Sequence, residues 1–460
     1  MQRRDALRTL SAGTLAAAGS GMLAGTAAAV PQAATPPPVP TPRGLPVIRI
    51  KDVQTILTAP NRIRLVIVKV VTDQPGLYGW GCATFTQRAL VVQTAVDQYL
   101  KPFLIGRRVD EIEDIWQASY VSSYWRNGGV LFNAMSGVDM ALWDILGKRA
   151  GLPLYQLLGG KVRHGADCYY HASGRDFQEV EDNARKGIEA GFRYVRVQGG
   201  VPGLATYGAA RTGAGADASA APAEPIGPTA PRDVWESAPY VRMLPKLFEH
   251  LRTKLGSEIQ LLHDVHERVP PIMAMQLAKD LEQFKLFFLE DIFAPEDNDY
   301  FRILRQQCVV PIAMGELFVN QHEYVPLIRD RLIDFIRVHI SDIGGLTPAR
   351  KLANLCEFFG VRTAWHGPGD TSPVGHAANL QLDLSSNNFG IQEASLFGER
   401  TKEVFPGCPE VRDGAMWSNE QPGLGIDVNE ELAAKYPFPE HPINGAWPEI
   451  RRRDGTVQKP

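Results

Sequence analysis

Three acidic residues, each placed where an apolar stretch ends, constrain the fold more than any other feature of the sequence. They are Asp264, Glu290 and Glu316, and the interval between successive acids is 26 residues in both cases. Each interval holds one amphipathic segment, at residues 272–283 and 299–307. That is the length of a strand, a helix and a second parallel strand. The sequence therefore predicts that the acids lie at the same height on three successive parallel strands.

Three carboxylates that meet at one edge repel one another unless a cation lies between them. Single acids at strand ends are common, but the repeated interval favours a site for a divalent metal ion. We therefore expect Asp264, Glu290 and Glu316 to be metal ligands.

Length and composition limit the kinds of protein to which such a site can belong. With 460 residues, 44% hydrophobic and 22% charged, the chain can form two domains, one of which could be a barrel of about 250 residues. A net charge of -3 argues against nucleic acid as a partner. The five cysteines are scattered, which indicates neither a disulfide framework nor a zinc site.

The N-terminal residues have the features of a leader. Arg3 and Arg4 precede an Ala/Gly-rich run at residues 10–26, and three alanines follow. This resembles a twin-arginine export signal over residues 1–29, which predicts a periplasmic or exported protein. The other interpretation is a disordered tail on a cytoplasmic protein. The run is too short and glycine-broken for a stable membrane span, and the Pro/Ala-rich residues 30–46 are typical of a linker.

Residues 47–164 are predicted to form an α+β domain. Three strands, the first two joined as a hairpin, precede three helices. The strands are expected at 47–57, 62–71 and from 79, and the helices at 89–103, 109–120 and 134–150.

Residues 165–400 change to a repeating pattern of strand and helix. Eight such units predict an α/β fold, a (β/α)8 TIM-like barrel with its chemistry at the C-terminal strand ends. Besides the three acidic strands, strands are expected at 168–171, 194–198, 334–340, 362–365 and 389–392. Residues 199–232 form a long Ala/Gly/Pro-rich insertion, either a lid over the site or, in part, disordered. Residues 401–460 are expected to return to the first domain.

Several motifs carry a family resemblance. Residues 137–145 (GVDMALWDI), residues 339–345 (HISDIGG) and the three acids resemble the enolase superfamily, in which the first domain caps the barrel. Four shorter motifs resemble the mannonate dehydratase subgroup of that superfamily. They are RVQ at 196–198, HDVHER at 263–268, WHGPGD at 365–370 and PGLGID at 422–427.

The resemblance implies a Mg2+-dependent dehydratase of acid sugars. Such an enzyme abstracts the proton α to the carboxylate and eliminates the 3-hydroxyl, which gives a 2-keto-3-deoxy acid. D-Mannonate is the first expected substrate and D-gluconate the second. The developing negative charge needs strong electrostatic stabilisation, and three oxygen ligands favour Mg2+ over zinc. The resemblance also implies a homo-oligomer.

Catalytic roles follow from the resemblance and from strand alternation. Arg196 stays protonated and is a poor base, so the resemblance assigns proton abstraction to Tyr207, with its pKa lowered by the arginine. His266 lies two residues after Asp264, and alternation points both to one side, where His266 could act as the general acid. His263 points the other way and is expected to be structural.

The expected substrate contacts come from several strands and from the first domain. They are His171, Arg337, His366, Asp370, Glu393 and Thr86. Thr86 stands where the subgroup has an asparagine, and the subgroup's C-terminal tryptophan is missing after Thr456. These departures put two specificity contacts in doubt.

Two other functions remain open. An epimerase or racemase of the same superfamily would use His366 as a base against a second base. A sugar-acid-binding protein without catalysis would keep the metal fold and lose turnover.

Overall fold

The computed structural model describes residues 44–126, 128–199, 233–439 and 450–459. The expected export signal, nearly all of the linker and the insertion from residue 200 lie outside these ranges. The chain divides into two units, Met1–Val47 and Ile48–Pro460. The N-terminal sheet, the barrel and the C-terminal segment all belong to the second unit.

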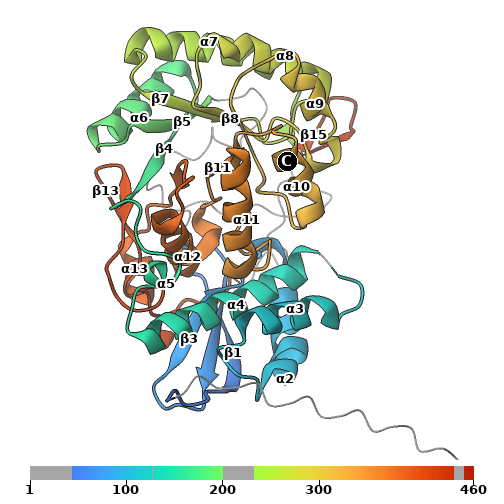
Figure 1. Ribbon diagram of the computed structural model, residues 1–460. Helices are drawn as coiled ribbons and strands as arrows, with labels where there is room; N and C mark the ends of the chain where they lie inside the picture. Colours follow the sequence, from blue (N-terminus) through green and yellow to red (C-terminus); the bar gives the residue numbers. More distant parts are fainter. Residues whose placement is uncertain (1–43, 127, 200–232, 440–449, 460) are drawn as a thin grey trace, which may run out of the picture. The chain divides into compact units, whose positions relative to one another are not determined.

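The N-terminal part of this unit is a three-stranded antiparallel sheet covered by helices (Figure 1). The strands are β1 (Ile50–Thr58), β2 (Leu65–Thr72) and β3 (Tyr78–Cys82), in the order β1-β2-β3. The hairpin of β1 and β2, rich in Ile and Val, is confirmed. The helices are α1 (Ala89–Thr94), a π-helical turn η2 (Ala95–Leu100), α2 (Lys101–Leu104), α3 (Ile112–Ser122), α4 (Gly129–Ala150) and α5 (Leu154–Leu157).

The barrel that follows has eight parallel strands, as predicted. They are β4 (Ala166–Gly174), β5 (Tyr194–Gly199), β7 (Gln260–Asp264), β8 (Phe288–Glu290), β9 (Ile312–Met314), β10 (Phe335–Ile336), β11 (Arg362–Thr363) and β12 (Gln392–Glu393). Neighbouring strands pair in chain order from β4 to β11. β12 pairs with β4, and a bridge between Thr363 and Phe389 joins the last two strands. The barrel is therefore closed.

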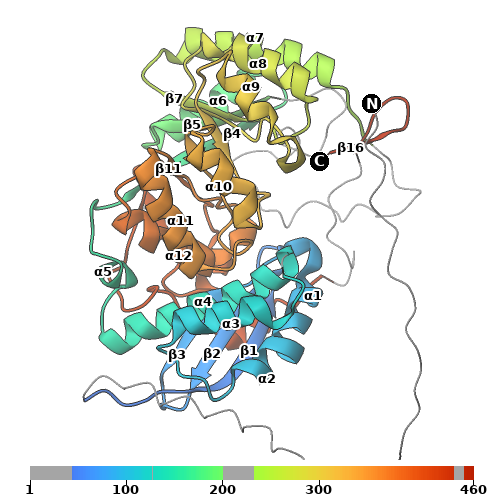
Figure 2. The same cartoon turned by 45° about the vertical axis from the view of Figure 1, so that its right-hand side comes forward.

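Helices lie between successive strands and cover the outside of the barrel (Figure 2). They are α6 (Phe177–Glu189), α7 (Ser237–Leu255), α8 (Pro271–Glu282), α9 (Tyr300–Arg305), α10 (Gln321–Arg329), α11 (Leu346–Phe359) and α12 (Ser372–Ser385). Both amphipathic segments between the three acids are helical, at α8 and α9. The first interval therefore has the meaning that the sequence predicted, since Asp264 and Glu290 are in register. The prediction of equal height is wrong for Glu316, because Glu290 is in register with Ala313 and Glu316 lies beyond the end of β9.

The sixth barrel strand is shorter than predicted. A strand was expected over residues 334–340, but β10 ends at Ile336. Beyond Arg337 the chain turns, with the N–H of Ile343 bonded to the carbonyl of His339. The neighbouring strands β9 and β11 end at Met314 and Thr363, the two residues paired with Ile336, so the ladder goes no further.

The C-terminal segment contacts both the barrel and the N-terminal sheet. It contains α13 (Glu399–Val404), β13 (Glu410–Arg412), β14 (Ala415–Trp417), α14 (Glu430–Ala433), β15 (Ile450–Arg451) and β16 (Val457–Gln458). β14 pairs with β4, and β15 lies between β16 and the short β6 (Asp233–Val234). The hydroxyl of Thr58 in β1 donates to the carbonyl of Ala433 in α14.

Helix α4 joins the three parts through two buried aspartates, which gives the GVDMALWDI motif a structural meaning. Asp139 accepts hydrogen bonds from the backbone N–H and the hydroxyl of Thr347, at the start of barrel helix α11. Asp144 accepts from the N–H of Trp80 in β3 at 3.0 Å and from that of Leu424 at 2.8 Å. A carboxylate near a helix N-terminus is stabilised by the unpaired backbone N–H groups there.

Gly423 makes the contact with Asp144 possible. Its φ is 74°, and a Cβ there would lie 2.1 Å from Asp144 Oδ1. We expect Gly423→Ala to lower the free energy of unfolding by about 2–4 kcal/mol, through backbone strain and the clash. Gly398→Ala is the control, since its φ is -73° and no atom lies near its Cβ position. A change within about 1 kcal/mol is expected there. Equal melting temperatures for the two variants would contradict the packing role.

Asp139 should make stability depend on pH. Burial, partly offset by the Thr347 hydrogen bonds, raises its pKa from 3.8 to about 7. Because the pKa of Asp139 is higher in the folded than in the unfolded protein, the protonated carboxyl stabilises the fold. This contribution is fully present below the unfolded pKa, and up to about 4 kcal/mol is lost as pH rises through about 7. Asp139→Asn should therefore lower the free energy of unfolding most at low pH and least at high pH. Urea unfolding of both proteins over that range tests this, and parallel pH profiles would contradict it.

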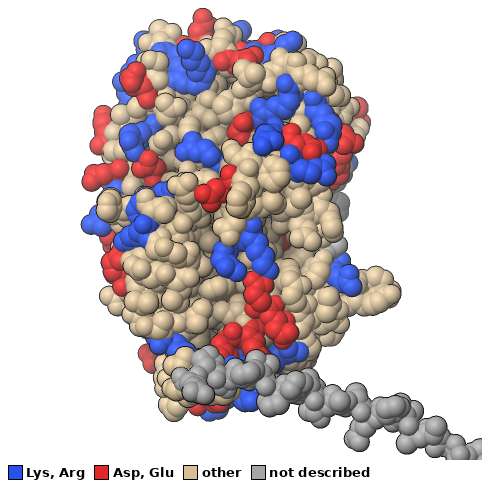
Figure 3. All heavy atoms as spheres, viewed as in Figure 1, with Lys and Arg blue, Asp and Glu red and all other residues tan. Residues whose placement is uncertain are grey.

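The surface adds two findings. On the face shown in Figure 3, basic and acidic side chains lie interspersed, in accordance with the small net charge of -3. None of the helices within the described ranges is long and apolar enough to span a membrane.

Candidate active site

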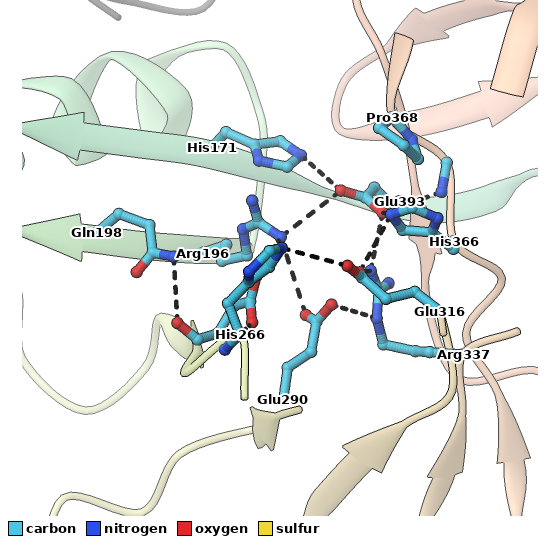
Figure 4. Close-up of polar contacts among 12 residues, drawn as sticks. His171, Arg196, Gln198, His266, Glu290, Glu316, Arg337, His366, Pro368 and Glu393 are labelled. Carbon is cyan, nitrogen blue, oxygen red and sulfur yellow. Dashed lines mark hydrogen bonds and ion pairs between the residues drawn. The ribbon is translucent and has the colours of Figure 1, made fainter. Parts of the chain in front are cut away.

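Alternation along the barrel strands builds the site in two layers. Apolar or aromatic side chains fill the barrel: Tyr169, Leu262, Phe288, Ala313, Phe335, Ala364 and Ile391. Two residues further along six of these strands stand polar side chains: His171, Asp264, Glu290, Arg337, His366 and Glu393. Because residues two apart on a strand point the same way, the polar side chains lie over the apolar layer. Figure 4 shows five of them, His171, Glu290, Arg337, His366 and Glu393, converging at one end of the barrel.

Asp264, Glu290 and Asp291 form a buried group of carboxylates. One oxygen of each lies within 4.8 Å of the others. Oδ2 of Asp291 has no hydrogen-bond partner among the described residues, whereas Glu290 is ion-paired with Arg337. A buried carboxylate oxygen without a partner is costly, and a bound cation would offset that cost. An oxygen-only set of this kind fits a hard divalent cation.

Asp291 was missed by the sequence analysis. Strict alternation places it on the opposite face from Glu290, but its φ of 42° lies in the left-handed region, where the alternation of an extended strand no longer holds. This backbone conformation is rare for a residue other than glycine, asparagine or aspartate. A reversal of this kind leaves no periodic signal in the sequence.

Glu316 lies beside histidines instead of within the carboxylate group. Its Oε2 is 3.1 Å from His366 Nε2, and its Oε1 is 3.5 Å from His266 Nε2. Arg337 Nη2 is 3.7 Å from Oε2. The structure therefore brings Asp264 and Glu290 together as predicted, whereas a ligand role for Glu316 stays a prediction.

Two arginines balance the charge of the acids. Arg196 Nη1 lies 3.3 Å from Asp264 Oδ2 and 3.7 Å from Glu393 Oε1. Arg337 is fully buried, with Nε 2.5 Å from Glu290 Oε1 and Nη2 2.8 Å from Glu393 Oε2. Both guanidinium groups stay protonated at any ordinary pH. They therefore hold a constant positive charge among the carboxylates of the barrel rim.

Burial and neighbouring charges shift the pKa values of these acids in opposite directions. Burial, to which Asp264 adds, raises the pKa of Glu290 well above its usual range despite the lowering effect of Arg337. Burial, to which Glu316 adds, does the same to the pKa of Asp291. Burial would also raise the pKa of Glu393, but Arg337 holds it well below the usual range. Glu393 is therefore ionised, and the other two gain most from a cation.

Two predicted histidines face Glu316 from different strands. His266 follows β7, and its backbone N–H donates to Asp264 Oδ1 at 2.7 Å. Burial would lower the pKa of His266, but Glu316 and Asp264 raise it overall. Burial lowers the pKa of His366 to about 4. At neutral pH, His266 is thus the more readily protonated of the two, as a general acid requires.

His339 is a second residue that the sequence analysis missed. Its Nδ1 lies 2.8 Å from Nδ1 of His366. The only signal was its position two residues after Arg337, on the same side of the predicted strand. At the matching point of the sixth strand the sequence shows Arg337, whereas the structure supplies a second imidazole as the partner of His366.

The remaining predicted contacts are placed as follows. His171 Nε2 lies 3.3 Å from Glu393 Oε1. Thr86, in the short helix η1 (Thr86–Arg88), donates to Asp370 Oδ2 at 3.5 Å, so the capping part reaches the barrel mouth. Tyr207 lies outside the described residues. His263 points away from the site, between the carbonyl of Val197 and the hydroxyl of Tyr240, which confirms a structural role.

Comparisons with known proteins agree with this architecture. Residues 45–159 match the family model of the mandelate racemase / muconate lactonizing enzyme N-terminal domain. Residues 179–432 match that of the enolase C-terminal domain-like family. The two matches define an enolase-superfamily protein, which confirms the resemblance seen in the sequence.

Close relatives narrow the assignment. A D-galactonate dehydratase family member of Pantoea ananatis is 55% identical over 414 residues, which cover 89% of this chain and 99% of the relative. One of Enterocloster bolteae is 48% identical over 413 residues, which cover 90% and 99%. A crystal structure of an enolase from Pantoea ananatis with bound D-gluconate and magnesium is 53% identical, with a TM-score of 0.83 and coverage of 90% and 100%. The chain belongs to the D-galactonate dehydratase family of the enolase superfamily.

Proposed function

We propose that the protein is a Mg2+-dependent dehydratase of six-carbon acid sugars. The observation that carries the proposal is the meeting, at one barrel rim, of a buried carboxylate group with a histidine whose pKa is raised and two permanently charged arginines. A pure binding site needs cationic groups for the acid but no proton donor. His266, held by Asp264 and facing Glu316, supplies that donor.

We assign the cation to Asp264 and Glu290, with Glu316 as the third ligand expected from the family. When bound, Mg2+ supplies Lewis-acid stabilisation of the charge that develops on the substrate carboxylate. The relative with bound D-gluconate and magnesium supports this assignment.

The residues of the chain perform the proton transfers. Arg196 and Arg337 attract the acid and orient its carboxylate. We assign removal of the C2 proton to Tyr207, and protonation of the departing 3-hydroxyl to His266 Nε2. Loss of water leaves an enol, which becomes the 2-keto-3-deoxy acid by tautomerisation. Both transfers need residues within hydrogen-bond reach of the substrate.

We propose D-gluconate and D-mannonate as the substrates to examine first. They differ only at C2, where the base acts. D-Gluconate is present in the related crystal structure, and the curated relatives are named for a third sugar acid, D-galactonate. Thr86, which contacts Asp370 at the mouth of the barrel, is the residue we expect to influence this choice.

The test is incubation of the protein with Mg2+ and each of these three acids, with detection of the 2-keto-3-deoxy acid by mass spectrometry. Product from one or more acids, absent with a chelator and in Tyr207→Phe, is the expected result. Binding of the acids without product in any reaction would overturn the proposal in favour of a binding protein.

Two further properties concern export and assembly. We infer from Arg3, Arg4 and the following Ala/Gly-rich run that residues 1–29 direct export. From the family we infer a homo-oligomer. Fractionation of cells that express the full chain tests the first, and sedimentation velocity tests the second.

A further inference from the structure

The loop at residues 265–268, directly after β7, carries the proposed general acid in an uncommon backbone conformation. His266 has a φ of 55° and Glu267 a φ of 53°. Positive φ values are rare for residues other than glycine, and they persist only where the surrounding structure holds them. The direction in which the imidazole of His266 leaves the backbone therefore depends on the contacts that hold this loop.

The next barrel strand holds the first part of the loop. The N–H of Val265 donates to the carbonyl of Glu290 at 2.9 Å, and the N–H of Glu267 donates to the carbonyl of Asp291 at 2.8 Å. The two acceptors are the last residue of β8 and the residue after it. These bonds continue the pairing of β7 with β8 into the loop and fix it as far as Glu267.

The C-terminal hairpin of β15 and β16 holds the end of the loop. Gln458 in β16 is buried, and its Nε2 donates to the carbonyl of Arg268 at 2.9 Å. Its Oε1 accepts from Arg452 Nε at 2.9 Å. Because a guanidinium group only donates and a carbonyl only accepts, these two partners fix the orientation of the amide. Arg268 in turn places Nη2 3.5 Å from Nδ1 of His266.

The hairpin that carries Gln458 is itself anchored at two places. β15 pairs with β16 and, in parallel, with β6. Beyond β6, the N–H of Trp235 donates to the carbonyl of Arg451 at 2.8 Å. Lys459 Nζ lies 3.3 Å from Glu296 Oε2, in the short helix η4 (Pro295–Asp297) after β8. Gln458 is thus presented to the loop by a fixed element.

We propose that Gln458 is a positioning residue, which holds the loop at residues 265–268 and thereby keeps the imidazole of His266 in its working orientation. The inference rests on the proposed function only for the reaction that His266 performs. A shift of a reacting group by about 1 Å lowers a rate by about 100-fold, so such a group needs fixed support. The hairpin therefore supports the site from a position 190 residues after Arg268 in the chain.

Two variants of Gln458 remove the hydrogen bond in different ways. Gln458→Glu keeps an acceptor for Arg452 but has no N–H for the carbonyl of Arg268, and Gln458→Met has a similar volume and makes neither bond. Lys459→Met is the matched control, because it removes a partly exposed ion pair of the neighbouring residue, which stabilises little. Hydrogen exchange of the full chain without substrate, followed by mass spectrometry, reports the backbone N–H groups of residues 265–268.

We expect both variants of Gln458 to speed up exchange in the loop about 5–10-fold, as loss of one hydrogen bond implies. The strands β7 and β8 should exchange as in the unmodified protein, and so should the loop in Lys459→Met. Unchanged exchange of the loop in either variant of Gln458, or an equal increase in Lys459→Met, would overturn the proposal.

Kinetics separates positioning from a merely structural role. With an acid that the protein dehydrates, the variants of Gln458 should lower kcat about 10–100-fold with little change in KM, and they should still exchange the C2 proton in D2O. General destabilisation would lower exchange and dehydration equally. Equal losses, or an unchanged kcat despite a loosened loop, would contradict the positioning role. Since hydrogen exchange of the loop needs no substrate, failure of the dehydratase assignment and failure of this inference remain distinguishable.

Discussion

Asp264→Asn is expected to abolish tight Mg2+ binding and to lower kcat by about 10³-fold. Asp264 belongs to the carboxylate group whose oxygens lie within 4.8 Å of one another, and it also accepts from Arg196 and from the N–H of His266. An amide there removes one negative charge from the cation site. A Lewis acid contributes several kcal/mol to stabilising developing charge, and each 1.36 kcal/mol is tenfold in rate.

Isothermal titration with Mg2+ measures the first effect without any substrate, and steady-state kinetics measures the second. Asp182→Asn is the matched control, because Asp182 is exposed on the barrel helix α6. Its Mg2+ affinity and rate should equal those of the unmodified protein. If Asp264→Asn kept both its Mg2+ affinity and its rate, Asp264 would not be a metal ligand.

His266→Gln is expected to separate proton abstraction from water loss. Glutamine retains a hydrogen-bond donor near the position of Nε2 but cannot release a proton. Loss of a general acid lowers kcat by about 10²–10⁴-fold. The first step does not use His266, so in D2O the variant should still exchange the C2 proton. Deuterium in the recovered acid sugar, measured by mass spectrometry, reports this step.

His322→Gln is the control for the second prediction, because His322 is exposed on α10. Mg2+ affinity should be unchanged in both variants. If His266→Gln lost exchange and dehydration together while still binding Mg2+, His266 would act in the first step, and the assignment of the general acid would be wrong.

Much of the site could be predicted because it follows from periodicity. The 26-residue interval placed Asp264 and Glu290 on neighbouring strands, where their Cα positions are in register. His266 follows the end of β7 with a φ of 55°, so strand alternation does not place it. The strand ends placed His366 and Glu393 at the same rim. These are backbone properties, and a sequence with regular spacing carries them directly.

What could not be predicted depends on local backbone reversal and on side-chain direction. The positive φ of Asp291 is a local reversal. Glu316 turns toward His266 and His366 because both imidazoles reach it from other strands. The pairing of His339 with His366 joins residues 27 apart in the chain. Contacts of this kind are set by tertiary packing and have no counterpart in spacing or composition.

The structural roles of the motifs GVDMALWDI and PGLGID also could not be predicted from the sequence. The sequence analysis used them only as evidence of family. In the structure, Asp139 and Asp144 of the first motif join α4 to α11 and to Leu424 in the second. They hold the capping part and the C-terminal segment in place, so their contribution is to stability and not to the chemistry of the rim.

The most direct measurement of the central claim is the reaction of the protein with Mg2+ and D-gluconate or D-mannonate in D2O, followed by mass spectrometry of both substrate and product. A dehydratase predicts a 2-keto-3-deoxy acid that has gained one deuterium at C3 when its enol tautomerises. Recovered acid that is inverted at C2 and carries deuterium there, with no loss of water, would instead show an epimerase or racemase and contradict the dehydratase assignment.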